Sequence, residues 1–191
     1  MMNNFNQENI ILELPSMKVF NSYIEALEEG FYRGNEAVKK SSEIADIKRD
    51  AKNYLSSLNT PPDGFYTVPS GEKFQKVPYE TLWLIHDDTF IGEVSFRHEL
   101  NEMLQNFGGH VGYGVRPSLA GQGFATLALR MTVERANNMG IKELLLTCSP
   151  DNPASRRVIE KNGGEFIDVS DKTYGFKDVC HRYYVPTLLN S

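Results

Sequence analysis

The hydrophobic and polar positions of the first 60 residues predict one short strand followed by two helices. The apolar run at 10–14 has the length and composition of a strand. After Pro15, Ser16 is placed to cap the first helix, because its hydroxyl can accept a hydrogen bond from a backbone N–H of the first turn. The apolar side chains that recur at helical spacing in this helix are Phe20, Tyr23, Ile24, Leu27 and Phe31.

A second helix is predicted from about Ser42 to the proline pair at 61–62, which cannot continue a helix. The apolar residues that share one face of it are Ile44, Ile47, Ala51, Tyr54, Leu55 and Leu58. The segment 60–76 is rich in Pro and Gly and has no period, so it is predicted to be a long loop. Such a loop could be a substrate lid or a disordered connection, and the pattern leaves both open.

Strand patterns recur through the rest of the chain. They predict strands at 81–85, 90–100, 110–115, 142–148, 165–169 and 178–185. The last two should close the chain as a hairpin, in which Tyr183 and Tyr184 alternate between core and surface. Gly112 and Gly114 interrupt the third strand, which indicates a bulge or the close approach of a backbone or a ligand. With the helices, this order predicts a mixed α/β fold.

Two more helices are predicted between these strands. The first runs over about 123–139 and stops at Gly140. Its inward residues are predicted to be Phe124, Leu127, Ala128, Met131 and Ala136. The second begins at Asn152, with proline at its first helical position, and ends at the glycine pair 163–164.

The composition excludes several classes of function. A length of 191 residues fits one domain over 1–191, and 40% hydrophobic with 24% charged residues is typical of a globular protein. The net charge of −5 argues against binding to nucleic acid, which needs a basic face. No signal peptide and no apolar run of the ~20 residues that a membrane span needs is visible. We therefore expect a cytoplasmic protein with no membrane partner.

The cysteines indicate neither a metal site nor a redox pair. Cys148 and Cys180 form no CxxC motif and no pattern of Cys and His ligands. We expect both to be reduced thiols in strands, and we expect no bound metal.

The stretch GQGFAT at 121–126 is the first candidate for chemistry. Its backbone N–H groups lie where a helix begins, and the first N–H groups of a helix have no internal partner. Together with the helix dipole they can bind a phosphate, and glycine removes the side chain that would keep the anion away. A plain tight turn explains the spacing equally well. The third glycine of a dinucleotide motif and the lysine of a P-loop are both absent.

The surroundings of this stretch resemble the GCN5-related N-acetyltransferase (GNAT) superfamily. The segments that carry the resemblance are VRPSLAGQGFATLALR, the buried strand after its helix, and DNPASRRVIEKNGG. Gly123 and Ala125 match the end of the family's glycine-rich motif, whereas Ala120 departs from its leading Gln or Arg. Asn152 and Ser155 match its Asn-x-x-Ser motif. The segment RHELNEML followed by GGHVGYGVRP also resembles a bacterial branch of predicted acetyltransferases.

The resemblance implies a GNAT-like fold with a mostly antiparallel central sheet, flanking helices, and strands that splay at the cofactor. It covers residues 80–186 as the cofactor-binding core, and 10–76, the acceptor side, by the order of elements only. Acetyl-CoA is the implied co-substrate, whose acetyl group passes directly to an amine. The implied cofactor-binding residues are Tyr113, Gly114, Val115, Gly121, Gln122, Gly123, Phe124, Ala125, Thr126 and Asn152. A backbone N–H in 112–114 would stabilise the oxyanion.

The general base is less clear, because Gly109 stands where many family members carry Glu. His110 is the first candidate, His98 the second and Glu93 the third. Each has a structural alternative: His98 as a core histidine, Glu93 as a solvated or salt-bridged residue, and His110 as a structural residue. The family's acidic Tyr position holds Ile159.

Other side chains have candidate roles with equally ordinary alternatives. Ser155 could donate a hydrogen bond to the leaving sulfur or bond its own backbone. Asn152 could contact the pantetheine arm, cap its helix, or do both. The arginines that could contact the phosphates of CoA are Arg116, Arg156 and Arg157.

Three classes of function remain open from the sequence. The first is an acetyl-CoA-dependent N-acetyltransferase, the second a non-catalytic acyl-CoA-binding or sensor module on the same fold, and the third another phosphate-binding α/β domain. The acceptor amine could belong to a peptide N-terminus, a lysine, a polyamine or an antibiotic. A homodimer is common in such families and is also left open.

Overall fold

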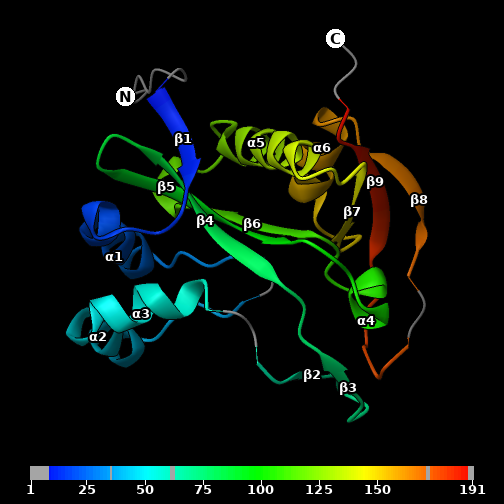
Figure 1. The fold of residues 1–191 in the computed structure, drawn as a ribbon, viewed down its shortest axis with the longest axis horizontal. Helices are drawn as coiled ribbons and strands as arrows, with labels where there is room; N and C mark the ends of the chain where they lie inside the picture. The colour runs from blue at the N-terminus through cyan, green and yellow to red at the C-terminus, as the bar shows by residue number, and fades with distance from the viewer. Residues whose placement is uncertain (1–8, 35, 61–62, 171–172, 189–191) are drawn as a thin grey trace. The chain divides into compact units, whose positions relative to one another are not determined.

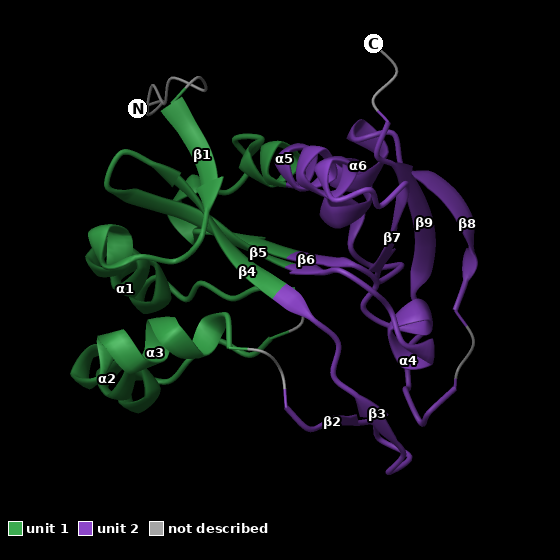
Figure 2. Cartoon of the chain, in the orientation of Figure 1, with its two compact units in different colours: residues 1–60, 80–95, 113–128 green, residues 61–79, 96–112, 129–191 purple. Residues whose placement is uncertain are grey.

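The computed structural model describes residues 9–34, 36–60, 63–170 and 173–188 of the chain. Helices and strands together form the mixed α/β fold that the sequence predicts (Figure 1). The chain divides into two compact units (Figure 2). Unit 1 comprises residues 1–60, 80–95 and 113–128, and unit 2 comprises residues 61–79, 96–112 and 129–191.

The largest sheet has four strands in the order β1-β4-β5-β6. Their bounds are Ile10–Glu13 for β1, Tyr79–His86 for β4, Thr89–Arg97 for β5 and Val111–Val115 for β6. β1 is antiparallel to β4, with Ile10 opposite His86. The pair Asp87-Asp88 turns the chain between β4 and β5, and Asp87 adopts a left-handed φ of 52°.

The N-terminal helices of unit 1 pack one apolar face against a common core. They are the 3-10 helix η2 (Met17–Val19), α1 (Phe20–Glu28), α2 (Ser41–Arg49) and α3 (Ala51–Leu58). All five apolar residues predicted for the first helix are buried, although Phe31 lies after the helix has ended. They pack with Ile44 and Ile47 of α2 and with Trp83, Ile85 and Phe90 of the sheet.

Two details of these helices differ from the prediction. Ser16 precedes a short 3-10 turn, and its side chain makes no capping hydrogen bond. The predicted second helix is two helices, because Asp50 leaves helical geometry (φ −131°, ψ 57°) and its side chain accepts a hydrogen bond from Asn53 N–H. An aspartate that caps the second helix interrupts the first. The proline pair 61–62 lies outside the described residues.

A three-stranded sheet lies in unit 2, with the order β7-β9-β8. Its strands are β7 (Glu143–Cys148), β8 (Glu165–Val169) and β9 (His181–Pro186), and β9 is antiparallel to both neighbours. The predicted hairpin is therefore confirmed. Tyr183 is buried and Tyr184 exposed, as the alternation of a strand requires.

The segment 60–76 is not a structureless loop, so that prediction was wrong. It contains a hairpin in unit 2, formed by β2 (Phe65–Thr67) and β3 (Lys73–Gln75). Tyr66 and Phe74 lie opposite each other and pack on a small core with the helix α4 (Glu102–Asn106), which the sequence pattern also failed to predict. Strands of three residues are too short to show a hydrophobic period, so only the packing reveals them.

The last two helices begin and end near the predicted positions. They are α5 (Phe124–Asn138) and α6 (Pro153–Lys161). The prediction of the inward face of α5 is only partly correct: Phe124, Ala128 and Ala136 are buried, but Leu127 and Met131 are half-buried. The remaining buried residues of α5 are Leu129, Thr132 and Val133. Because the middle of this face is a threonine, the pattern of large apolar residues does not reveal which face is buried.

Candidate active site

The glycine-rich loop in unit 1 has an unusual backbone and an open surface. After the 3-10 turn η3 (Pro117–Leu119), Gly121 and Gly123 take left-handed φ values of 77° and 89°. A Cβ added to either glycine would meet no other described atom within 4 Å. The glycines are therefore required by the turn of the backbone, while no described residue fills the space next to their Cα atoms.

The N–H groups of this loop point to what could fill that space. Within the part of the chain that the structure describes, no hydrogen bond is made by the N–H groups of Gly121, Gln122, Gly123 or Ala125. Helix α5 begins at Phe124, so these groups cluster where its dipole is positive. An anion with several acceptor oxygens, such as a diphosphate, could satisfy them together.

In the strand β6, Gly114 is required for a different reason. Tyr113 O accepts a hydrogen bond from Gly34 N–H over 3.2 Å. A Cβ at Gly114 would overlap Tyr32 O and lie 3.0 Å from Arg33 Cα, and a Cβ at Gly92 of β5 would overlap Gly114 O. The close approach that the sequence indicated at Gly114 is therefore made by the chain's own backbone.

His110 lies in unit 2, where the chain enters β6. Its N–H donates to Leu145 O over 2.8 Å, and its Nδ1 accepts from Leu145 N–H over 2.9 Å. Because Nδ1 accepts this bond, the proton of the neutral ring must sit on Nε2. Burial lowers the pKa of His110, and the charge of Arg97 lowers it further.

The geometry of His110 therefore favours donation over proton abstraction. The one lone pair of the neutral ring is engaged by Leu145, while Nε2–H remains a hydrogen-bond donor. The neighbouring Gly109 has a φ of 59°, and a Cβ there would overlap Leu145 O. No side chain can occupy position 109 in this backbone, which explains why the glutamate implied by the family resemblance is absent.

The other two candidates for the base lie in different surroundings. His98, in unit 2, is half-buried; its ring lies edge-to-face with Phe96, the centroids 5.2 Å apart. Glu93, in unit 1, is buried, and its carboxylate accepts from Arg33 Nη1 and Trp83 Nε1, both over 2.9 Å. Burial raises the pKa of Glu93. The salt-bridged alternative is correct, but the solvated one is wrong.

The start of α6 in unit 2 has the local geometry that its sequence predicts. Asn152 caps the helix, because its Oδ1 accepts from Ser155 N–H over 2.9 Å. Ser155 is half-buried in the first turn. Ile159 is fully buried, and a Cβ at Gly164 would overlap its Cγ2, so this position belongs to the core.

The candidate arginines are engaged by nearby groups. Arg116 donates to Glu29, Glu25 and Ser22 within unit 1. In unit 2, Arg156 pairs with Glu160 over 2.7 Å, and Arg157 Nε donates to Pro153 O. These contacts give each arginine a structural reason to be present.

The predicted residues divide between the two units. Unit 1 contains Tyr113, Gly114, Val115 and the loop 121–126, and unit 2 contains His98, His110, Asn152 and Ser155. Arg33 and Gly34 were not among the predicted residues, because their contacts with β5 and β6 have no local signal in the sequence.

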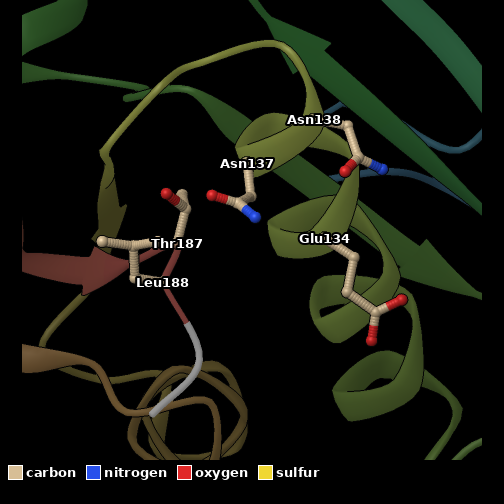
Figure 3. A pocket seen from close by; sticks show the side chains of 5 residues that line it. All are labelled: Glu134, Asn137, Asn138, Thr187 and Leu188. Atoms are coloured by element: carbon tan, nitrogen blue, oxygen red, sulfur yellow. The ribbon is translucent and has the colours of Figure 1, made fainter. Parts of the chain in front are cut away.

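One pocket of unit 2 contains none of the predicted site residues. It has a volume of about 360 Å³ and is lined by Glu134, Asn137, Asn138, Thr187 and Leu188. Three of these side chains come from the end of α5 and two follow β9 (Figure 3). We assign no role in the reaction to this pocket.

The described residues offer neither a metal site nor a membrane span. No group of three or more His, Cys, Asp or Glu side chains among them could hold a metal ion. None of the helices formed by these residues is both long and apolar enough to cross a membrane.

Comparisons with known proteins agree with the resemblance seen in the sequence. The family model described as "Acetyltransferase (GNAT) domain" matches residues 38–165. A comparison with curated proteins gave no match.

Solved structures show the same fold at low sequence identity. The microcin C7 self-immunity acetyltransferase MccE, in complex with acetyl-CoA and AMP, is 14% identical with a TM-score of 0.58, covering 94% of this chain and 93% of that one. A chimera of spermidine N-acetyltransferase SpeG from Vibrio cholerae and hSSAT is 11% identical with a TM-score of 0.57, covering 94% and 96%. The ribosomal L7/L12 α-N-protein acetyltransferase RimL, in complex with CoA, is 13% identical with a TM-score of 0.54, covering 93% and 94%.

Proposed function

From the premise that the chain belongs to the GNAT acetyltransferase family, which uses acetyl-CoA as its acetyl donor, we propose that it is an N-acetyltransferase. The acetyl group passes from the thioester to a primary amine by direct attack, with both substrates bound at once. The observation that carries the proposal is the open glycine-rich loop at the start of α5. The N–H groups of Gly121, Gln122, Gly123 and Ala125 make no hydrogen bond within the described residues, so they suit a diphosphate.

The cofactor-binding residues follow from this loop. The N–H groups of 121–126 bind the diphosphate of acetyl-CoA, and the backbone of Tyr113, Gly114 and Val115 on the edge strand β6 lies along the pantetheine arm. Asn152 contacts the same arm while it caps α6. A diphosphate needs no arginine here, because the helix terminus supplies both the donors and the positive potential.

The catalytic roles follow from hydrogen-bonding capacity. His110 stays neutral and donates from Nε2–H to the thioester oxygen, where negative charge develops in the transition state. His98 is then the candidate that takes the proton of the attacking amine, since both oxygens of Glu93 are engaged. Ser155 donates a hydrogen bond from its hydroxyl to the leaving sulfur.

A second function stays open on one observation. Ile159 is fully buried at the position of the family's acidic tyrosine, so this chain lacks that proton donor. A protein that binds acyl-CoA without turning it over, as a sensor, would have no need of one. The third interpretation, another phosphate-binding domain, is not kept because the family model matches.

The wider assignments rest on the family and on charge. We propose one acetyltransferase domain, since the matched residues 38–165 run through both units, and a cytoplasmic location. The similar structures include enzymes whose names specify a microcin, spermidine and a ribosomal protein, so the acceptor class stays unassigned beyond an amine. A homodimer is compatible with this function.

Binding and turnover test the proposal separately. Calorimetry measures acetyl-CoA binding to the wild type and to Gly123→Trp. Gly140→Trp is the matched control, because Gly140 follows the end of α5, has a left-handed φ of 79° against 89° for Gly123, and likewise has no described atom within 4 Å of a Cβ. We expect Gly123→Trp to weaken acetyl-CoA binding at least about tenfold, or about 1.4 kcal/mol, and the control to leave it unchanged.

Turnover then separates the enzyme from the sensor. Thiol release from acetyl-CoA is followed with spermidine, a lysine-containing peptide and a peptide with a free N-terminus, and mass spectrometry identifies the acetylated product. Binding without release for every amine would favour the sensor. Normal acetyl-CoA binding by Gly123→Trp would contradict the assignment of the loop.

A further inference from the structure

The connection that follows α1 lies directly on β6 within unit 1. Gly34 N–H donates to Tyr113 O, and the absence of a Cβ at Gly114 lets Tyr32 O and Arg33 Cα come within contact distance. Residues 31–34 are therefore in contact with the part of β6 to which we assign the pantetheine arm. Any role of this connection in binding the acceptor depends on that proposed function.

A buried ion pair fixes this connection to the sheet. Arg33 Nη1 donates to Oε1 of Glu93 over 2.9 Å, and Trp83 Nε1 donates to Oε2 over the same distance. The Glu93 side chain is 6% exposed and that of Arg33 is 19% exposed. The second terminal nitrogen of Arg33 pairs with Glu36, which lies nearer the surface. One guanidinium therefore joins the connection to β5 beneath it.

The chemistry of these two side chains suits them to fixing the position of residues 31–34. A guanidinium has a planar, rigid set of donors, so it fixes direction as well as distance, which an ammonium on a flexible chain does not. A buried carboxylate that loses its cation is left uncompensated, so it must take up a proton or the local structure must rearrange to let water reach it. The conformation of residues 31–34 therefore depends on both partners.

We propose that Arg33 and Glu93 are positioning residues that hold the 31–34 connection on β6, where the connection serves as a wall of the acceptor side that the family resemblance implies for residues 10–76. Tyr32 is the side chain that such a wall would present, since it is 52% exposed and its carbonyl lies against Gly114. The pair acts through the connection and touches neither substrate. Its loss should change how the amine is bound more than how acetyl-CoA is bound.

The test uses the full-length protein and the variants Glu93→Gln and Arg33→Lys. Glu93→Gln keeps the shape and the acceptor for Trp83 but removes the charge, and Arg33→Lys keeps the charge but removes the rigid set of donors. Lys48→Met is the control: it removes an exposed ion pair between Lys48 and Glu28 in the same unit without touching 31–34. Thermal melting checks that each variant is folded.

Hydrogen exchange of the peptide that contains Gly34 is the first measurement, with and without acetyl-CoA. We expect exchange in 31–34 to be roughly tenfold faster in Glu93→Gln, less so in Arg33→Lys, and unchanged in the control. In the wild type, saturating acetyl-CoA should slow exchange in the same peptide. Unchanged exchange in a folded Glu93→Gln, or no effect of bound acetyl-CoA on this peptide, would overturn the proposal.

Kinetics with whichever panel amine the wild type acetylates is the second measurement. In Glu93→Gln we expect the KM for the amine to rise about fivefold, while the acetyl-CoA affinity stays within about twofold. Faster exchange with an unchanged KM for the amine would make the pair purely structural and refute the acceptor wall. If the wild type acetylates no panel amine, the proposed function is contradicted, and the exchange data still decide whether the pair holds 31–34.

Discussion

Because of the hydrogen bond from Leu145 N–H to His110 Nδ1, the contribution of His110 to stability can be tested separately from its role in catalysis. Leu145 is buried, so a side chain at 110 without an acceptor leaves its N–H unsatisfied. We compare His110→Leu, which has no acceptor, with His110→Asn, whose Oδ1 can take the place of Nδ1. Leaving a buried donor unsatisfied costs about 1–3 kcal/mol. We therefore expect His110→Leu to lose about 2 kcal/mol of unfolding free energy and His110→Asn to lose about 0.5 kcal/mol.

The unfolding free energy of the wild type should also depend on pH because of His110. The pKa of His110 is lowered in the folded state, so the unfolded chain binds a proton more readily than the folded one. The stability that this group contributes is complete above its unfolded pKa of about 6.5 and is lost as the pH falls below that value towards the folded pKa. Protonation of Nδ1 also breaks the hydrogen bond from Leu145 N–H, and this too lowers the stability of the folded state as the pH falls.

Urea unfolding followed by circular dichroism from pH 8 down to pH 5 measures both effects. We expect the wild type to lose stability below about pH 6.5 more steeply than His110→Asn, which has no group titrating at this position. Equal stabilities of the Leu and Asn variants, or a wild type that gains stability relative to Asn as the pH falls, would refute the assigned bond. If His110 donates from Nε2, the rate of thiol release by His110→Asn should fall by a far larger factor than its small loss of stability accounts for.

Two further predictions concern the backbone of unit 2. Asn152→Ala should lose about 1 kcal/mol of stability, because Ser155 N–H loses its cap acceptor, and Asn152→Ser should restore most of it in the same urea assay. Gly109→Ala should destabilise by about 1–3 kcal/mol, because its Cβ would overlap Leu145 O, whereas Gly112→Ala meets no atom within 4 Å and should be close to neutral in thermal melts. A neutral Gly109→Ala would contradict the close approach at that position.

Elements with a long period or a strong boundary signal could be predicted from the sequence. The stripe of α1, the strand β7 and the hairpin of β8 and β9 have this character, and so does the start of α6, where Asn152 is followed by proline. The break at Asp50 could not be predicted, because the apolar face continues across it and only the backbone turns. The β2–β3 hairpin is held by packing on α4 rather than by its own pattern.

The candidate site likewise contains some features that the sequence predicts and others that it does not. The glycine-rich loop and the Asn-x-x-Ser motif are local, so the sequence contains them completely. Glu93 is different: the sequence left open whether it is solvated or salt-bridged, and β5 is buried on both faces. A carboxylate is tolerated there only because a cation reaches it, and that cation is 60 positions away at Arg33. No local pattern predicts a partner at that separation.

Three glycines of unit 1, at positions 114, 121 and 123, look alike in the sequence, yet the first serves the packing of the fold and the other two leave room for a ligand. At Gly114 a side chain would meet the chain's own backbone, so its absence serves packing. At Gly121 and Gly123 a Cβ would meet no atom of the described residues within 4 Å, so packing does not require the glycines there. Left-handed backbone alone could account for a glycine in a turn, but it does not account for N–H groups that bond to no described residue. Substitutions at 114 should therefore lower mainly the stability, whereas those at 121 and 123 should lower the affinity for acetyl-CoA in addition to the cost of a side chain on left-handed backbone.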